Sequence, residues 1–127
     1  MKNGTITSEW SVKGYLLVRL EGTITGSLVK SEFLFVSSKL ITRGGRSLVL
    51  IDGSKAKVGD PQLVKEVGKF FRNRKDIRRA AVGGASGAKA FFFSMLLKLN
   101  GPEYPMKGFK TVEEAENWLL FKREEDS

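Results

Sequence analysis

The 127-residue chain is 41% hydrophobic and 28% charged, a balance typical of one folded domain, and its formal net charge is +8 at pH 7. It contains no cysteine and no histidine, which excludes disulfides, thiol catalysis, Ser-His-Asp hydrolysis and most zinc chemistry. We therefore expect a protein that is not an enzyme and that has no catalytic residue, no metal site and no cofactor.

The first half of the chain predicts a hairpin, a helix and a buried strand. Residues 6–12 alternate along the chain, Lys13-Gly14 forms a turn, and residues 15–20 are again extended. A helix follows, with Ser27 as its N-cap and Gly44-Gly45 at its end. Its apolar residues recur at helical spacing at Val29, Phe33, Val36 and Leu40. The apolar run from Ser47 predicts a central strand that ends at Asp52.

The second half predicts three more helices and two strands. Asp60-Pro61 starts a helix whose apolar stripe is Leu63, Val64, Val67, Phe70 and Phe71. A strand over residues 77–82 leads through a glycine-rich loop to a helix over residues 87–99, with a core stripe that includes Phe91 and Phe92. After a short strand at 106–109, Thr111 and Glu114 form a capping box for the last helix. That helix is expected to bury Ala115, Trp118, Leu119 and Phe121, and residues 124–127 to fray.

The resulting order, β-β-α-β-α-β-α-β-α, predicts an α/β fold with a mixed sheet, antiparallel at the hairpin and parallel through the helical crossovers. We expect a single domain over residues 1–127 with its core at about 6–121. No signal peptide follows Met1, and no apolar run approaches the roughly 20 residues that cross a bilayer. The protein is expected to be cytoplasmic and not transmembrane.

Four features of the chain point to a known family: the hairpin, the strand ending in Asp52, the stretch Val82-Gly83-Gly84-Ala85-Ser86-Gly87-Ala88-Lys89, and above all the ending from Gly108 to Leu119. In these features the chain resembles the SpoIIAA-like branch of the STAS/Sec14-type domains. The resemblance implies a STAS-like fold and a regulatory module that acts through a protein partner. In the anti-sigma-factor antagonists of this group, a kinase partner phosphorylates a serine in an Asp-Ser-Ser-Gly-type motif. That motif falls near Asp60-Pro61-Gln62-Leu63, where proline and glutamine replace the serines, so the phosphoswitch is not expected here.

A ligand site is predicted where the loops after two neighbouring parallel strands converge. The residues that would hold an anionic or small polar ligand are Ser54, Lys55, Gly84, Ser86, Gly87 and Lys89. The second loop leads into a helix N-terminus, whose free amides attract anions. The glycine spacing matches neither the Walker nor the dinucleotide motif. The alternative is structural: the glycines form a tight turn, Ser86 caps the helix and Asp52 accepts hydrogen bonds from loop amides.

Phe93 and Leu97 fall outside the predicted core stripe of their helix and are candidates for a protein interface, a homodimer face or an apolar ligand site. Phe35 and Leu34 raise the same question on the first helix. The alternative for Phe93 and Leu97 is burial beneath the last helix or the 101–108 loop.

Residues 55–79 hold nine basic and three acidic residues and thus six of the eight net positive charges. Such a segment favours anionic partners or simply forms a solvated helix face. Aromatic residues do not interleave with these cations, so no specific nucleic-acid binding is expected.

Two functions are compatible with the sequence. The first is a non-enzymatic regulatory module that binds a protein partner or forms a homodimer. The second is a Sec14-like binder or sensor of an amphiphilic or anionic small molecule, which would bind near residues 83–89.

Overall fold

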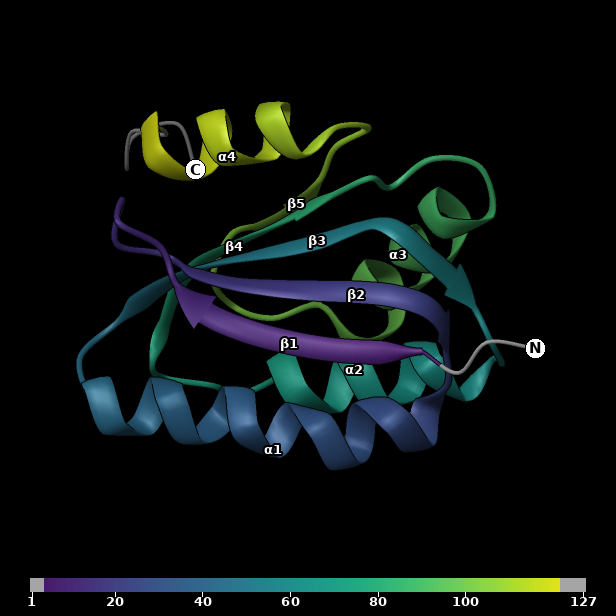
Figure 1. Cartoon of the computed structure of the whole chain (residues 1–127), viewed down its shortest axis with the longest axis horizontal. Coiled ribbons are helices and arrows are strands. Elements are labelled where there is room, and N and C mark those ends of the chain that lie inside the picture. Colours follow the sequence, from purple (N-terminus) through teal and green to yellow (C-terminus); the bar gives the residue numbers. More distant parts are fainter. Residues whose placement is uncertain (1–3, 122–127) are drawn as a thin grey trace.

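The computed structural model describes residues 4–121, apart from the side chains of Leu99 and Asn100 (Figure 1). The strands are β1 Thr5–Trp10, β2 Leu16–Ile24, β3 Ser47–Val58, β4 Ile77–Gly83 and β5 Met106–Gly108. The helices are α1 Gly26–Arg43, α2 Gln62–Phe71, α3 Ala88–Asn100 and α4 Val112–Phe121. The predicted α/β class and the predicted order of elements are confirmed.

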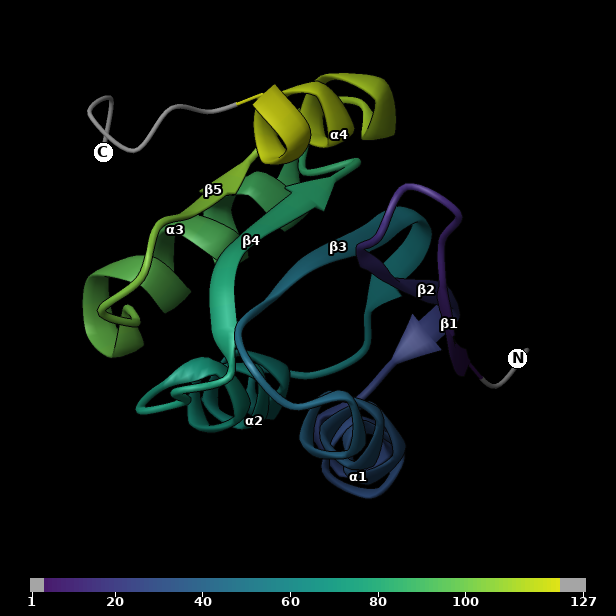
Figure 2. The ribbon, with the colours of Figure 1, turned by 90° about the vertical axis from the view of Figure 1, so that its left-hand side faces the viewer.

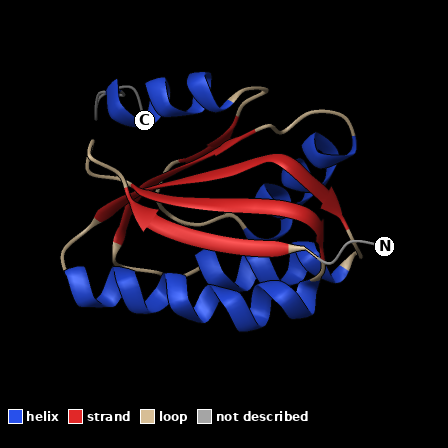
Figure 3. Cartoon of the chain, in the orientation of Figure 1, coloured by secondary structure: helices blue, strands red, loops and turns tan. Residues whose placement is uncertain are grey.

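The five strands form one mixed sheet in the order β1-β2-β3-β4-β5. β1 and β2 are antiparallel because a tight turn joins them, whereas the three pairs that involve helical crossovers are parallel. Helices lie on both sides of the sheet (Figure 3). α1, α2 and α3 lie on one side, and α4 lies on the other over β3 and β4 (Figure 2).

The side chains of β3 alternate between two apolar cores. Val49 and Ile51 belong to the larger core, between the sheet and the α1–α2 layer. Leu50 belongs to a smaller core beneath α4, together with Tyr15 and Leu119. Both faces of β3 are therefore buried, which explains the continuous apolar run at its start.

Two helix starts share one carboxylate. The N-cap of α1 is Thr25, whose Oγ1 accepts a hydrogen bond from the Leu28 amide at 3.2 Å, and not Ser27 as predicted. Asp60 Oδ1 accepts hydrogen bonds from the amide of Leu63 in α2 at 3.2 Å and from the amide of Gly26 in α1 at 3.0 Å. Asp60 therefore caps α2 as predicted and in addition joins the two helix starts.

β3 does not end at Asp52 but continues to Val58 through a β-bulge. Arg19 pairs with Asp52 and Glu21 with Lys55, so β3 has one residue more than β2 in this interval. β4 ends at Gly83, opposite Asp52, and beyond this point β3 pairs with β2 alone. The sequence Asp-Gly-Ser resembles a strand end because these residues have low β propensity, and a bulge tolerates them equally well.

Three side chains lie elsewhere than predicted. Phe91 and Phe121, expected in the core, are 62% and 74% exposed, and Val12 lies fully exposed in the hairpin turn beyond the end of β1. Phe93 follows the alternative given for it, burial beneath the 101–108 segment: it is half-buried and packs so close to β5 that a Cβ on Gly108 would lie 2.7 Å from its ring. α3 has apolar residues on most sides, so the sequence does not reveal which of its faces packs on the sheet.

The predicted frayed segment, residues 124–127, lies outside the described residues. None of the described helices has both the length and the apolar character that crossing a bilayer requires.

Candidate functional site

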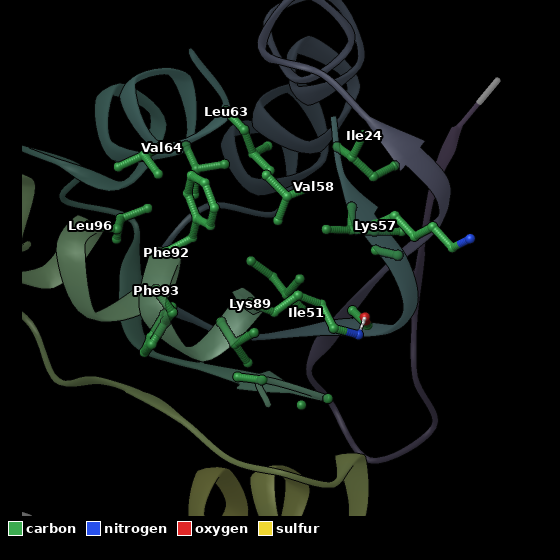
Figure 4. A pocket seen from close by; sticks show the side chains of 18 of the residues that line it. Ile24, Ile51, Lys57, Val58, Leu63, Val64, Lys89, Phe92, Phe93 and Leu96 are labelled. Carbon is green, nitrogen blue, oxygen red and sulfur yellow. Dashed lines mark hydrogen bonds between the residues drawn. The ribbon is translucent and has the colours of Figure 1, made fainter. Parts of the chain in front are cut away.

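An apolar cavity of about 110 Å³ lies between the sheet and the helices α2 and α3 (Figure 4). On the sheet side its larger lining side chains are Leu20, Ile24, Ile51, Val58, Val82 and Met106. On the helix side they are Phe33, Leu63, Val64, Val67, Phe92, Phe93 and Leu96. Carbon atoms thus form nearly all of its wall.

The cavity arises where the sheet and the helices separate. β4 ends at Gly83, while β3 continues past its bulge together with β2, so α3 has less sheet to pack against. The residues that line this region also have little or no side chain to fill the space: Gly53, Ala56, Gly83, Gly84 and Ala85. The result is an apolar pocket that opens to solvent on one side.

The charged residues among the described lining residues are Lys57 and Lys89. Lys89 Nζ donates hydrogen bonds to the carbonyl oxygens of Gly53 at 2.9 Å and Ser54 at 3.4 Å, and so joins the first turn of α3 to the bulge of β3. Lys57 lies on β3, with its stem along the cavity and its amino group turned outward (Figure 4). Any charge that a ligand meets from these lining side chains is therefore positive.

The side chains of Asp52 and Ser54 are hydrogen-bonded to each other inside the bulge. Asp52 Oδ1 accepts hydrogen bonds from the Ser54 amide at 3.0 Å and from the Ser54 hydroxyl at 2.6 Å. The predicted structural role of Asp52, as an acceptor for loop amides, is confirmed. With its hydroxyl bound to a carboxylate that already holds the loop, Ser54 serves the bulge geometry.

The structure brings only part of the predicted ligand site to the cavity. Gly84 and Lys89 line it, and Gly84 approaches Ser54 so closely that a Cβ there would lie 2.5 Å from the Ser54 Cα. Lys55 is exposed on β3, and Ser86 and Gly87 are exposed in the loop before α3. Gly87 occupies the N-cap position without a side-chain hydrogen bond, so Ser86 does not cap the helix through its hydroxyl as the structural alternative had it.

The two candidate interface residues of α3 are both half-buried. Phe93 lines the cavity, whereas Leu97 is not among the lining residues. Among the described side chains of α3, the large apolar one that is exposed is Phe91. The sequence places Phe92 and Leu96 in the core but does not predict the cavity beside them. The lining residues of a cavity look like those of any core. The small residues at 83–85 are the one feature of the sequence that points to unfilled space.

Two cations of the basic segment have structural roles. The Arg74 guanidinium donates to both carboxylate oxygens of Asp76 at 2.8 Å and to the Ser37 hydroxyl at 3.1 Å, and it lowers the pKa of Asp76. Arg79 is buried and donates to the Leu119 carbonyl at 2.9 Å. Within residues 4–121, no group of three or more acidic side chains is placed to hold a metal ion.

The comparisons with known proteins concern the family and the fold. A family model described as SpoIIAA-like matches residues 15–120. The crystal structure of an uncharacterised protein from Shewanella loihica PV-4, described as having a SpoIIAA-like fold, aligns with a TM-score of 0.63 at 19% sequence identity. The alignment covers 91% of this chain and 93% of that one, and at this identity it shows the fold alone. No curated protein matches the chain.

Proposed function

Because the chain belongs to the SpoIIAA-like family, we propose that it is a non-enzymatic regulatory module, and that the signal it receives is an amphiphilic small molecule with an anionic head. The apolar part of the ligand would occupy the cavity between the sheet and the α2–α3 pair. The head would lie at the cavity mouth beside Lys57 and Lys89.

The single observation that supports this proposal is the carbon-lined cavity of about 110 Å³. An engineered apolar cavity of about 150 Å³ stays dry and binds benzene, so a slightly smaller one accepts a chain segment of about four or five carbons. Each methylene that enters contributes about 0.8 kcal/mol, or about a fourfold gain in affinity. A tail of this length contributes about 3–4 kcal/mol, which corresponds to millimolar binding at best, so the head has to add affinity.

The charge of the head follows from the lysines. An ammonium group has three donors, and Lys89 uses two of them on the carbonyl oxygens of Gly53 and Ser54. The third donor and the exposed amino group of Lys57 remain to meet a carboxylate or phosphate. A cationic head would instead be repelled by both.

The experiment is a melting series with straight-chain carboxylates of increasing length. We expect the melting temperature to rise with chain length up to the cavity's capacity and then to level off, because binding to the folded state alone stabilises it. Alcohols of the same length should give smaller shifts and alkylamines the smallest. Equal shifts for carboxylates and amines would contradict the anionic head.

Two variants test separately whether the cavity binds the ligand's apolar tail and whether Lys57 binds its anionic head. Val67→Phe, on α2, should fill the cavity and abolish the shift for every ligand of the series. Lys57→Gln should reduce the carboxylate shift and leave the alcohol shift unchanged. If Val67→Phe folds and still responds like the parent protein, the cavity is not the binding site.

A second candidate function is the protein-interaction module, and the side chains of α3 favour it. Phe92 and Phe93 face the cavity, while the adjoining Phe91 is exposed, so one helix contacts both the ligand space and the surface. We expect ligand binding to slow hydrogen exchange at α3 amides, which a partner would then sense. Pro61 and Gln62 stand where the antagonists' motif has its serines, and Asp60 before them caps two helices, so this regulation would not use that phosphorylation site.

A further inference from the structure

The outward face of α1 carries a strip of exposed residues without a single charge. We call it the α1 strip, and its members are Ser31, Leu34, Phe35, Ser38, Ile41 and Thr42. Leu34, Phe35 and Ile41 remain 69%, 65% and 67% exposed. In a chain with 28% charged residues, an uncharged solvent face with three large apolar side chains indicates a contact surface.

The spacing of the strip is that of a helix–helix seam. Ser31 and Ser38 are seven residues apart, as are Leu34 and Ile41, and the two series alternate as the a and d positions of a heptad do. A small residue therefore alternates with a large one along the seam. The charged residues of α1 flank the strip at Lys30, Glu32, Lys39 and Arg43.

We propose that the α1 strip binds the α1 strip of a second copy of this chain, with the two helices antiparallel and the two-fold axis near Val36. In this register Leu34 faces Ser38 of the second copy, and Ser31 faces Ile41 of the second copy. Both layers thus pair a large side chain with a small one, the arrangement in which facing layers interdigitate. An interface in which residue i meets j and j meets i is the isologous kind that closes a dimer.

The charged residues of α1 lie outside the seam. Counted from Ser31 at a, Glu32 and Lys39 are at b positions, on the side of α1 where Lys39 donates to the carbonyl and the hydroxyl of Ser8 in β1. The fit between large and small side chains therefore carries the register, and charge pairs do not.

The expected dimer is a weak one. α1 has 18 residues and is about 27 Å long at 1.5 Å per residue. One helix face of this length falls short of the roughly 800 Å² per partner of a standard interface. We therefore expect a dimer whose population rises across the micromolar range. The inference does not depend on the ligand proposal, because the strip and the cavity are separate surfaces.

Cysteine cross-linking tests the register, since the chain has no cysteine of its own. Leu34→Cys and Ser38→Cys chains, mixed and oxidised, should form a disulfide-linked heterodimer, because a disulfide needs Cα atoms within about 7 Å. Neither variant alone should cross-link comparably. Efficient cross-linking of Ser38→Cys with itself would indicate parallel helices and overturn the proposal, and so would the absence of cross-linking in the mixture.

Sedimentation equilibrium over a concentration series tests the surface itself. The parent protein should show a monomer–dimer equilibrium, and Ile41→Glu should weaken it at least tenfold, since it places a charge in the seam. Phe91→Glu is the matched control, with a similarly exposed side chain on α3, and should leave the equilibrium unchanged. A parent protein that stays monomeric throughout, or a dimer that resists Ile41→Glu, would refute the proposal.

Discussion

Gly84 packs closely against the backbone of the β3 bulge. Its φ is +80°, and a Cβ would lie 2.5 Å from both N and Cα of Ser54. Gly84→Ala should therefore cost about 2–4 kcal/mol of unfolding free energy, from left-handed strain and from overpacking against backbone. Urea denaturation measures this loss.

Gly87 provides the control for Gly84. It also has a positive φ, +58°, but a Cβ there would meet nothing within 4 Å. Gly87→Ala should carry backbone strain alone, since φ +58° with ψ −130° is a conformation that alanine rarely adopts, and it should cost about 1–3 kcal/mol. Equal losses for the two alanine variants would show that the contact between Gly84 and Ser54 is not a close one.

Tyr15 and Glu116 form a pH-dependent pair that joins β2 to α4. The Tyr15 hydroxyl donates to Glu116, and Lys13 Nζ lies 3.0 Å from the same carboxylate. The hydrogen bond from Tyr15, followed by that from Lys13, lowers the pKa of Glu116. Burial, followed by the bond to Glu116, raises the pKa of Tyr15 from 10.0 to about 12.

The two shifts stabilise the fold in different pH ranges. The contribution of Glu116 is present above the ordinary carboxyl pKa and disappears as the pH falls through its lowered value. The contribution of Tyr15 is present below pH 10 and disappears as the pH rises towards about 12. Tyr15→Phe should therefore flatten both limbs of a plot of unfolding free energy against pH. An unchanged profile in this variant would mean that the bond contributes nothing.

At the scale of elements, α4 is attached through a few buried side chains. Leu119 is fully buried, whereas Phe121 is 74% exposed. Leu119→Ala should cost about 2–5 kcal/mol, because it leaves a cavity in the smaller core. Phe121→Ala should change stability by less than about 0.5 kcal/mol. Thermal unfolding of both variants measures the difference, and a large loss for Phe121→Ala would place that side chain in the core after all.

The elements that were predictable from sequence are those with one dominant signal. α2 has a single apolar stripe, the paired start Asp60-Pro61 and a charged outer face, and it folds as expected. The closing helix begins at the predicted cap, where Thr111 Oγ1 accepts from the Glu114 amide at 3.1 Å. The second half of β3 was missed because Asp52, Gly53 and Ser54 suit a bulge as well as a turn.

The packing face of α3 and the cavity beneath it were not predictable. Three consecutive phenylalanines put apolar side chains on most sides of that helix, and the end of β4 decides which of them meets the sheet. A cavity depends on how whole elements fit together, so its lining residues resemble those of any core. Of the two glycines predicted for the ligand site, Gly84 lines the cavity and Gly87 does not.

At the scale of the whole molecule, the net charge of +8 destabilises the folded state through repulsion between like charges. Most cations of residues 55–79 are exposed, so they repel one another within the roughly 10 Å over which charges act at 0.1 M salt. Raising sodium chloride from about 10 mM to about 150 mM shortens that range, so it should raise the melting temperature by a few degrees. Calorimetry checks the sign, and a fall on adding salt would show that attractive pairs outweigh the repulsion.

The agreement between strand order and chain order has a consequence for biosynthesis. Each strand pairs with the strand made just before it, so a nascent chain can extend its sheet as it leaves the ribosome, without waiting for a distant partner. α4 follows all five strands along the chain, and it alone among the described helices covers the smaller core around Leu50. Until α4 emerges, that face of the sheet stays bare, and it is there that chaperones and proteases would meet the unfinished protein.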